Sequence, residues 1–265
     1  FILIKTDIVP LILSRIIFFS LLMSIMNETD SLPTPRLSLS AALRAGLSSA
    51  RENALPGLVL WLVAMAVVLG YYFFSPVTDA LETLGALKSR GGFLYSAIAT
   101  AIFGGLIPFF WRSAMNRKSG QSSWPVRPWQ AGLFLAAFWA WKGVEVDLFY
   151  RFQDILFGAG AEASKIIPKV LMDQFVYNPV WAAWTQILAY WWLENSFRPA
   201  SLADRALWSS IGPRVLSILI STWGVWIPMV SIIYAMPSNL QIPLFNIALC
   251  FWSLMLSSLT KEKKR

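Results

Sequence analysis

The chain has 265 residues and a formal net charge of +8, and 57% of its residues are hydrophobic whereas only 14% are charged. A soluble domain of this length cannot bury so much apolar surface, so we expect much of it to face lipid. The sequence contains no histidine and one cysteine, Cys250. This excludes an intrachain disulfide and histidine-based catalysis, and we expect no enzyme activity, no cofactor and no metal site.

Residues 1–26 form an N-terminal segment that we exclude from the fold. The segment is largely apolar, but Pro10 and Arg15 interrupt it. It is therefore either a span, a signal segment or sequence upstream of the natural start, which we expect at Met23 or Met26.

Three further segments complete the expected organisation. Residues 27–53 are polar, and we expect them in the cytoplasm; their basic part over 37–51 is typical of a transit sequence or of a helix at the membrane surface. Residues 54–260 form the transmembrane domain, and 261–265 form a basic tail.

Apolar runs of the length that a helix needs to cross a bilayer of about 30 Å recur through the transmembrane domain. They cover 54–74, 91–111, 129–146, 169–192, 211–236 and 242–259. The last two, joined by the turn over 236–241, are either two spans or one broken hairpin. The sequence thus predicts an all-α, multi-pass transmembrane bundle of about six spans.

The charges between these runs predict the orientation. With six spans and both termini inside, the inside segments hold fourteen Lys and Arg residues and the outside loops hold four, among them Lys88, Arg90 and Lys165. This excess follows the positive-inside rule. Because the basic residues lie in short clusters beside apolar runs, we expect a lipid bilayer and no nucleic acid as partner. We expect a bacterial inner membrane, with a mitochondrial inner or peroxisomal membrane as the alternative.

Small residues and prolines stand out inside the spans. Ala97, Ala101 and Gly105 recur every four residues, a spacing that lets another helix approach closely and that predicts either packing within the chain or a homo-oligomer. We expect kinks at the prolines inside spans, which are Pro108, Pro179 and Pro228.

One polar cluster lies at the end of the third run. It contains Lys142, Glu145, Asp147, Arg151 and Asp154. One interpretation is a helix that leaves the membrane and solvates these charges while Lys142 extends toward the surface. The other is that the cluster lines a path for a small polar solute, since ionisable groups at membrane depth are often functional. In that case Asp173 and Gln174, early in the fourth run, complete the path.

The sequence resembles the peroxisomal-membrane-protein and Mpv-seventeen family over residues 91–259. The first similar stretch has Gly143, Tyr150, Asp154, Lys169, Asp173, Gln174 and Pro179 at the spacing of the family's conserved run. The second stretch has Trp226, Pro228, Pro237, Asn246 and Trp252. The family's histidine falls on Asp147 and its proline on Val144. Its other polar positions fall on Val230, Ile233 and Gln241.

Two functions follow from the cluster and the resemblance. The resemblance implies a small multi-pass membrane protein with a pore or permeability role, so the first is a channel or transporter-like protein for small polar solutes. The alternative is a membrane scaffold or assembly partner that transports nothing, in which the same charges form ion pairs between helices.

Overall fold

The computed structural model describes residues 39–117 and 124–262, and these are helical apart from short connections. The elements are α3 (Leu39–Phe73), α4 (Ser75–Thr100), η1 (Ala101–Leu106), α5 (Ile107–Arg117), α6 (Pro128–Phe157), α7 (Ala163–Met172), η2 (Asp173–Ala182), α8 (Ala183–Glu194), α9 (Pro199–Leu202), α10 (Arg205–Ala235) and α11 (Ser238–Glu262). The all-α prediction is confirmed for this part of the chain. The expected segment 1–26 lies outside the described residues.

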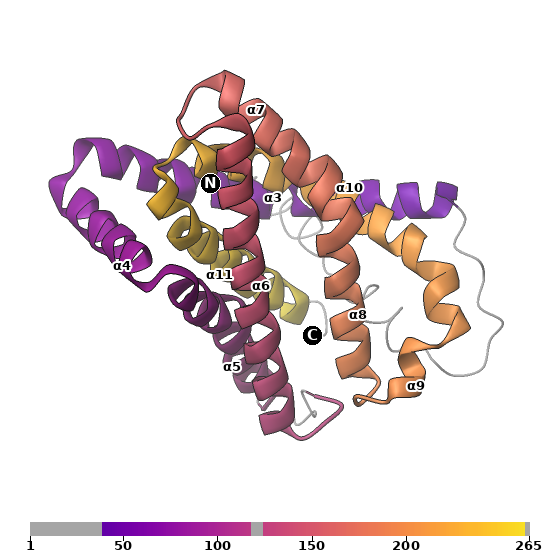
Figure 1. The fold of residues 1–265 in the computed structure, drawn as a ribbon. Helices are drawn as coiled ribbons and strands as arrows, with labels where there is room; N and C mark the ends of the chain where they lie inside the picture. Colours follow the sequence, from indigo (N-terminus) through magenta and orange to yellow (C-terminus); the bar gives the residue numbers. More distant parts are fainter. Residues whose placement is uncertain (1–38, 118–123, 263–265) are drawn as a thin grey trace, which may run out of the picture.

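Each predicted apolar run falls, to within one residue at its end, inside its own continuous helical run. This holds because α4, η1 and α5 follow one another without a break, as do α7, η2 and α8. In Figure 1 α6 stands between α4–α5 on one side and α7–α8 on the other, and α3 lies across the back. Among the described residues, three helical stretches are long and apolar enough to cross a membrane, namely Leu39–Phe73, Ser75–Arg117 and Arg205–Ala235. These apolar helices indicate a membrane location, and the count of six spans stays a prediction.

The helices extend further than the apolar runs suggested. Residues 39–53, expected as part of a polar cytoplasmic segment, are the first turns of α3 and pack on α10. Residues 75–90, expected as an outside loop, are helical in α4. At Gly92 the backbone has φ 53° and ψ −130°, which bends α4 between its two parts. A residue with a side chain rarely adopts that conformation, so glycine is required there.

Two segments have π-helical hydrogen bonding, and each is associated with a proline. Pro108 is the second residue after η1, and Pro179 lies inside η2. A proline lacks the N–H of a regular helix and its ring collides with the carbonyl four residues before it, so the wider π turn accommodates the ring. The expected distortion at these two prolines therefore takes the form of π-helix.

The longest helix contact joins α3 to α10. A Cβ atom added at Gly57 would lie 2.6 Å from Val225 Cγ2, so the glycine lets the two backbones come close. Two side chains of α3 also donate to backbone carbonyls of α10: Asn53 Nδ2 lies 3.0 Å from the Ser221 oxygen, and Trp61 Nε1 lies 2.9 Å from the Val225 oxygen.

The expected small-residue face on α4 and η1 meets α6 of the same chain. Gly105 is buried, and a Cβ atom there would lie 2.9 Å from the Leu135 carbonyl oxygen of α6. The neighbouring Ser96 and Thr100 are fully buried as well. This packing within one chain accounts for the small residues, and the homo-oligomer through Ala97, Ala101 and Gly105 stays a prediction.

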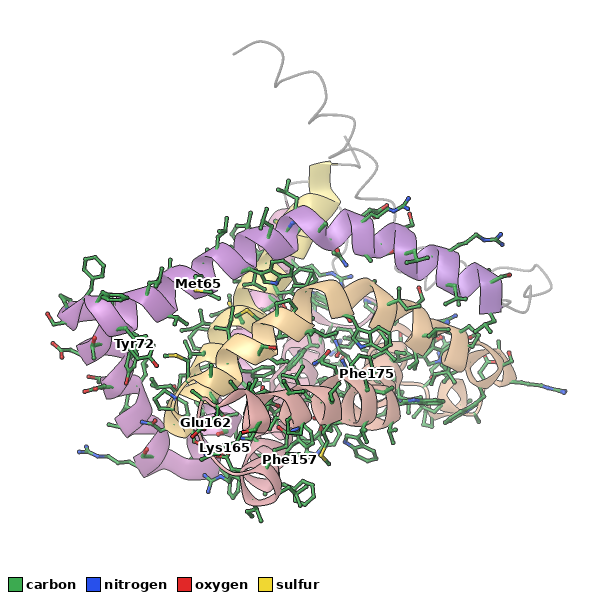
Figure 2. All side chains as sticks on the ribbon, turned by 90° about the horizontal axis from the view of Figure 1, so that it is seen from above. Met65, Tyr72, Phe157, Glu162, Lys165 and Phe175 are labelled. Atoms are coloured by element: carbon green, nitrogen blue, oxygen red, sulfur yellow. The ribbon has the colours of Figure 1, made fainter. Side chains whose placement is uncertain are left out.

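The outer surface of α3 is strongly apolar. Leu62 is 62% exposed, Met65 is 45% exposed and Tyr72 is 60% exposed, and Figure 2 labels the last two. A soluble monomer rarely presents such a continuous apolar face to water. Lipid is the solvent that suits it.

Candidate polar site around α6

The polar residues of α6 point into the protein and form hydrogen bonds with α4, η2 and α7. Lys88, Lys142, Asp147, Lys169, Asp173 and Gln174 are all at most 7% exposed. They are shielded by neighbouring helices, and the interpretation of a helix end that solvates its charges is wrong for Lys142 and Asp147. Arg151, with a side chain 53% exposed, is the member of the cluster that reaches the surface.

Asp147 lies at the contact between α4 and α6. Its Oδ2 accepts hydrogen bonds from Lys88 Nζ and from Ser96 Oγ, both at 2.7 Å, and its Oδ1 accepts one from Arg151 Nε at 3.0 Å. The interaction of Asp147 with Arg151 is the i,i+4 pair that the sequence suggested. Lys88 is the more deeply buried partner, because the helical part of α4 before Gly92 brings it against α6.

Close packing at Gly143 makes this arrangement possible. A Cβ atom at Gly143 would lie 2.2 Å from the Ser96 carbonyl oxygen and 2.6 Å from Thr100 Oγ1. The missing side chain therefore lets α4 approach α6 closely enough for the Ser96 hydroxyl to reach Asp147. Thr100 in turn donates to Asn246 Oδ1 of α11 at 2.8 Å.

A second group joins α6 to the π-helical segment η2. Lys142 Nζ donates to Glu145 Oε1, and the Tyr177 hydroxyl donates to the same oxygen. Lys142 Nζ also lies 3.4 Å from Thr185 Oγ1 of α8. Glu145 is therefore neutralised within its own helix and is linked to η2 by a phenol.

A third group lies toward the end of α6. Lys169 Nζ of α7 donates to Asp154 Oδ1, and the Ser238 hydroxyl of α11 donates to Asp154 Oδ2 at 2.8 Å. Gln153 Nε2 lies 3.1 Å from the Lys169 carbonyl oxygen. Because Lys169 is only 1% exposed, its ammonium depends on Asp154 for compensation.

Asp173 stands apart from these ion pairs. Its carboxylate accepts hydrogen bonds from the Tyr234 hydroxyl of α10 at 2.6 Å and from Gln174 Nε2 at 2.9 Å. The sequence grouped Asp173 with Lys142, Glu145 and Asp147 around one path. The structure brings these residues into one region of buried helices but gives them separate hydrogen-bond partners.

Other residues of the resemblance have packing roles. Tyr150 and Tyr234 have ring centroids 4.9 Å apart, and Trp252 belongs to the same hydrophobic core. The Pro179 carbonyl accepts from Trp184 Nε1 at 2.8 Å. Trp226 and Pro228 lie on α10, and Pro237 lies in the turn before α11.

The polar partners that the sequence interpretation missed include Lys88, Ser96, Tyr177 and Tyr234. Lys88 was assigned to a loop, although the absence of a turn signal between Val77 and Ser89 favours a helix there. The two tyrosines lie inside apolar runs and carry no signal in a single sequence. Their hydroxyls found acidic partners only through tertiary packing.

One ion pair of the described residues lies at the surface, at the start of α7. Glu162 and Lys165, labelled in Figure 2, form a 3.0 Å ion pair beside the connection between α6 and α7. A hydrogen bond from its own backbone N–H, together with Lys165, lowers the pKa of the Glu162 carboxyl. This exposed pair provides a control for the buried ones.

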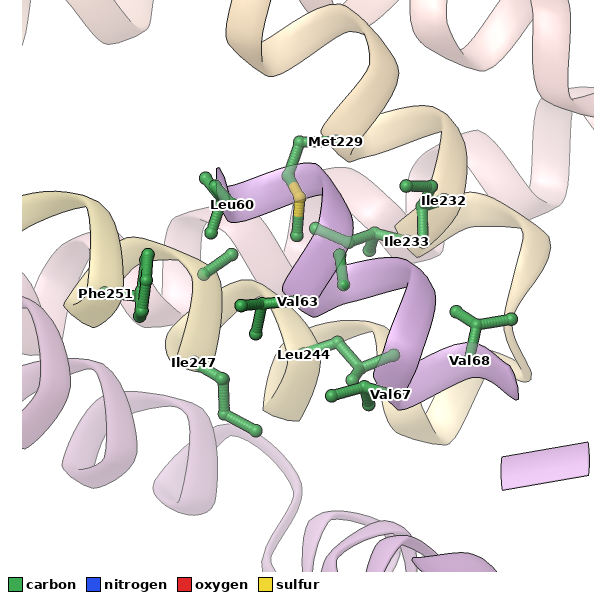
Figure 3. A pocket seen from close by; sticks show the side chains of 12 residues that line it. Leu60, Val63, Val67, Val68, Met229, Ile232, Ile233, Leu244, Ile247 and Phe251 are labelled. Atoms are coloured by element: carbon green, nitrogen blue, oxygen red, sulfur yellow. The ribbon is translucent and has the colours of Figure 1, made fainter. Parts of the chain in front are cut away.

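The cavity drawn in Figure 3 has a different character from the polar groups. It lies between α3, α10 and α11, and all of its lining residues are apolar, including Leu60, Met229 and Phe251. None of the residues expected to line a solute path contributes to it. Among the described residues, no three acidic or cysteine side chains gather closely enough to bind a metal ion.

The chain was compared with protein-family models, with curated proteins and with solved structures, and no match was found. The resemblance to the peroxisomal-membrane-protein family therefore stays a prediction from the residues themselves.

Proposed function

We propose that the chain is an integral membrane protein that transfers small polar solutes across the bilayer as a carrier whose polar interior is closed in this conformation. The observation that supports this most is the burial of Lys88, Lys142, Asp147, Lys169 and Asp173 among helices that otherwise expose apolar surface. Ionisable side chains at such positions are energetically costly and commonly belong to substrate or ion pathways.

Packing alone gives little reason for these charges. Hydrophobic residues of similar volume in place of a buried ion pair often leave stability unchanged or raise it. A protein that only needed to hold α4 against α6 would do so as well with an apolar contact. Exchangeable ion pairs suit a carrier, because a polar solute can take the place of one partner when the helices separate.

Closed pairs favour a carrier over an open channel. Lys88 is bonded to Asp147, Lys142 to Glu145 and Lys169 to Asp154, so each ammonium already has an acidic partner. A solute must therefore compete with an internal bond, which requires helix movement. The two π-helical segments flank these pairs, and π turns are frequent at functional sites.

The test is a flux assay on the full chain in liposomes. Vesicles are mixed with a graded series of polyols and small organic anions, and entry is followed by osmotic swelling. We expect faster entry of at least one probe than into protein-free vesicles. Solute-tight vesicles containing correctly folded protein contradict the proposal.

A membrane scaffold is the second candidate, and two of the ion pairs favour it because Lys88–Asp147 and Lys169–Asp154 link different helices. The double substitution Lys88→Met with Asp147→Leu distinguishes the two functions, since it removes both buried charges together. The charge that loses its partner is that of Arg151, whose side chain is 53% exposed. A carrier loses flux in this variant while keeping its stability. A scaffold keeps both its stability and its partner binding. Glu162→Gln, at the exposed pair, is the matched control and leaves both functions unchanged.

A further inference from the structure

Asp173 is a buried carboxylate without a cationic partner in the described part of the chain. It is 7% exposed, and its two oxygens accept hydrogen bonds from the neutral groups of Tyr234 and Gln174. The other acidic side chains of this region, the buried Asp147 and the partly buried Glu145 and Asp154, each form an ion pair. Asp173 therefore lacks the bonded cation that each of the other three has, and we expect it to have a different role.

The groups that face Asp173 come from each of the helices around it. On α7, Lys169 is the nearest cation in sequence, but its ammonium is bonded to Asp154. On α6, Tyr150 stacks edge-on against Tyr234. One helical turn after Asp173, Tyr177 donates its hydroxyl to Glu145. Apart from the ammonium of Lys169, which lies 5.9 Å from the centre of the Tyr234 ring and is bonded to Asp154, the surroundings are phenols and an amide. A carboxylate buried among them without a bonded cation is energetically unfavourable.

Gln174 supplies a second, independent observation. Its side chain is 2% exposed, Nε2 is bonded to Asp173, and Oε1 has no hydrogen-bond partner. A buried amide oxygen beside a carboxyl group lacks a donor. A proton on Asp173 is such a donor, and a half-turn of the amide brings Oε1 to face it; the oxygen and nitrogen of an amide are nearly isosteric, so the turn needs no extra space.

We propose that Asp173 is a proton-exchange site, and that its proton drives the carrier; the coupling presupposes the transport function proposed above. Protonation forms an O–H bond on one carboxylate oxygen and converts a hydronium ion of the aqueous phase to water. Release on the opposite side reverses the step. A metal cation fits less well, because it needs several oxygen ligands whereas both oxygens of Asp173 already accept a hydrogen bond.

The test is pH-difference infrared spectroscopy on the full chain in lipid nanodiscs. A protonated buried carboxyl group has a C=O stretching band that is separate from the carboxylate bands. We expect the wild type to gain such a band as pH is lowered and to lose it as pH is raised. We expect Asp173→Asn to lack the band. Glu162→Gln, which removes an exposed carboxyl group, keeps it. An unchanged band in Asp173→Asn overturns the assignment.

Tyr234→Phe gives a readout that does not depend on the Asn variant folding. It keeps the carboxyl group of Asp173 but removes one hydrogen bond to it, so the band stays and its frequency shifts. An unshifted band means that another carboxyl group produces it, and overturns the proposal.

Exchange of sodium for choline at constant pH separates a proton from a metal cation. The band is unaffected if the site takes only a proton. Loss of the band on adding sodium identifies a cation site and overturns the proton assignment. The two proposals can fail separately. Liposomes that admit no solute contradict the carrier but do not affect the infrared band. A band that survives Asp173→Asn contradicts the proton site but does not affect solute flux.

Discussion

Two buried aspartates of this protein differ in the charge of their hydrogen-bond partners. Asp147 receives three hydrogen bonds, two of them from the cationic side chains of Lys88 and Arg151, whereas Asp173 receives two from neutral groups. In a protein interior, removal of one partner from an ion pair leaves the other charge uncompensated. The same substitution at the two sites should therefore have different consequences.

Asp147→Asn should lower the free energy of unfolding by about 3–5 kcal/mol, the range observed when one partner of a buried pair is lost, because Lys88 stays buried without its carboxylate. Asp173→Asn should leave stability unchanged or raise it, since it removes a charge that has no cation. Thermal unfolding in detergent, followed by circular dichroism, measures both. Equal losses of stability at the two sites would contradict the difference in pairing.

Gly143 is the residue on which the approach of α4 to α6 depends most directly. In Gly143→Ala the new methyl group overlaps the Ser96 carbonyl, and overpacking of this kind costs about 1–3 kcal/mol. Gly224→Ala is the matched control, because a Cβ atom there meets nothing within 4 Å and alanine favours a helix by about 1 kcal/mol. We expect a lower melting temperature for the first variant and an equal or higher one for the second. Equal melting temperatures for the two variants would mean that the contact between α4 and α6 at Gly143 can accommodate a methyl group.

At the scale of the helices, Gly92 sets the direction of the first part of α4. That part carries Lys88 to Asp147, so the bend positions a residue of the site. Gly92→Ala adds a methyl group that meets no atom within 4 Å, and the effect therefore reports backbone conformation alone. We expect a loss of about 1–3 kcal/mol together with weaker flux. A variant as stable as the wild type would show that α4 can adopt another backbone conformation at residue 92.

The sequence predicted the helices better than it predicted their ends. Each apolar run lies inside a helical run because hydrophobic length is a local property. The first turns of α3 were expected only as one alternative, a helix at the membrane surface, and the first part of α4 was missed. Their stability comes from packing on α10 and α6. The π-helical segments η1 and η2 were foreseen only as kinks at Pro108 and Pro179.

For the site, the sequence identified the acidic members and the short-range pair of Asp147 with Arg151. It did not identify Lys88 as the partner of Asp147, because the two residues are far apart in the chain and meet only through tertiary packing. The same applies to Tyr234 and Asp173. The sequence predicted one shared path, whereas in the structure these residues form separate hydrogen-bonded groups with partners on different helices.

At the scale of the whole molecule, three helical stretches in the part of the chain that the structure describes have the length and apolar character of membrane spans. The six-span arrangement adds α6, the run from α7 to α8, and α11. The added helices carry most of the buried ionisable side chains. Whether those charges lie inside the bilayer therefore depends on whether α6 and α7–α8 cross it.

Cysteine labelling in sealed, oriented vesicles tests this most directly. Single cysteines are placed in a Cys250→Ala background at Ala161, which is exposed between α6 and α7, and at Ala203, which is exposed between α8 and α10. A membrane-impermeant maleimide is then added from one side. If α7–α8 spans the bilayer, the two positions react from opposite sides, Ala203 from the inside and Ala161 from the outside. Reaction of both from the same side would contradict the account, because the charged groups of α6 would then lie outside a membrane-spanning bundle.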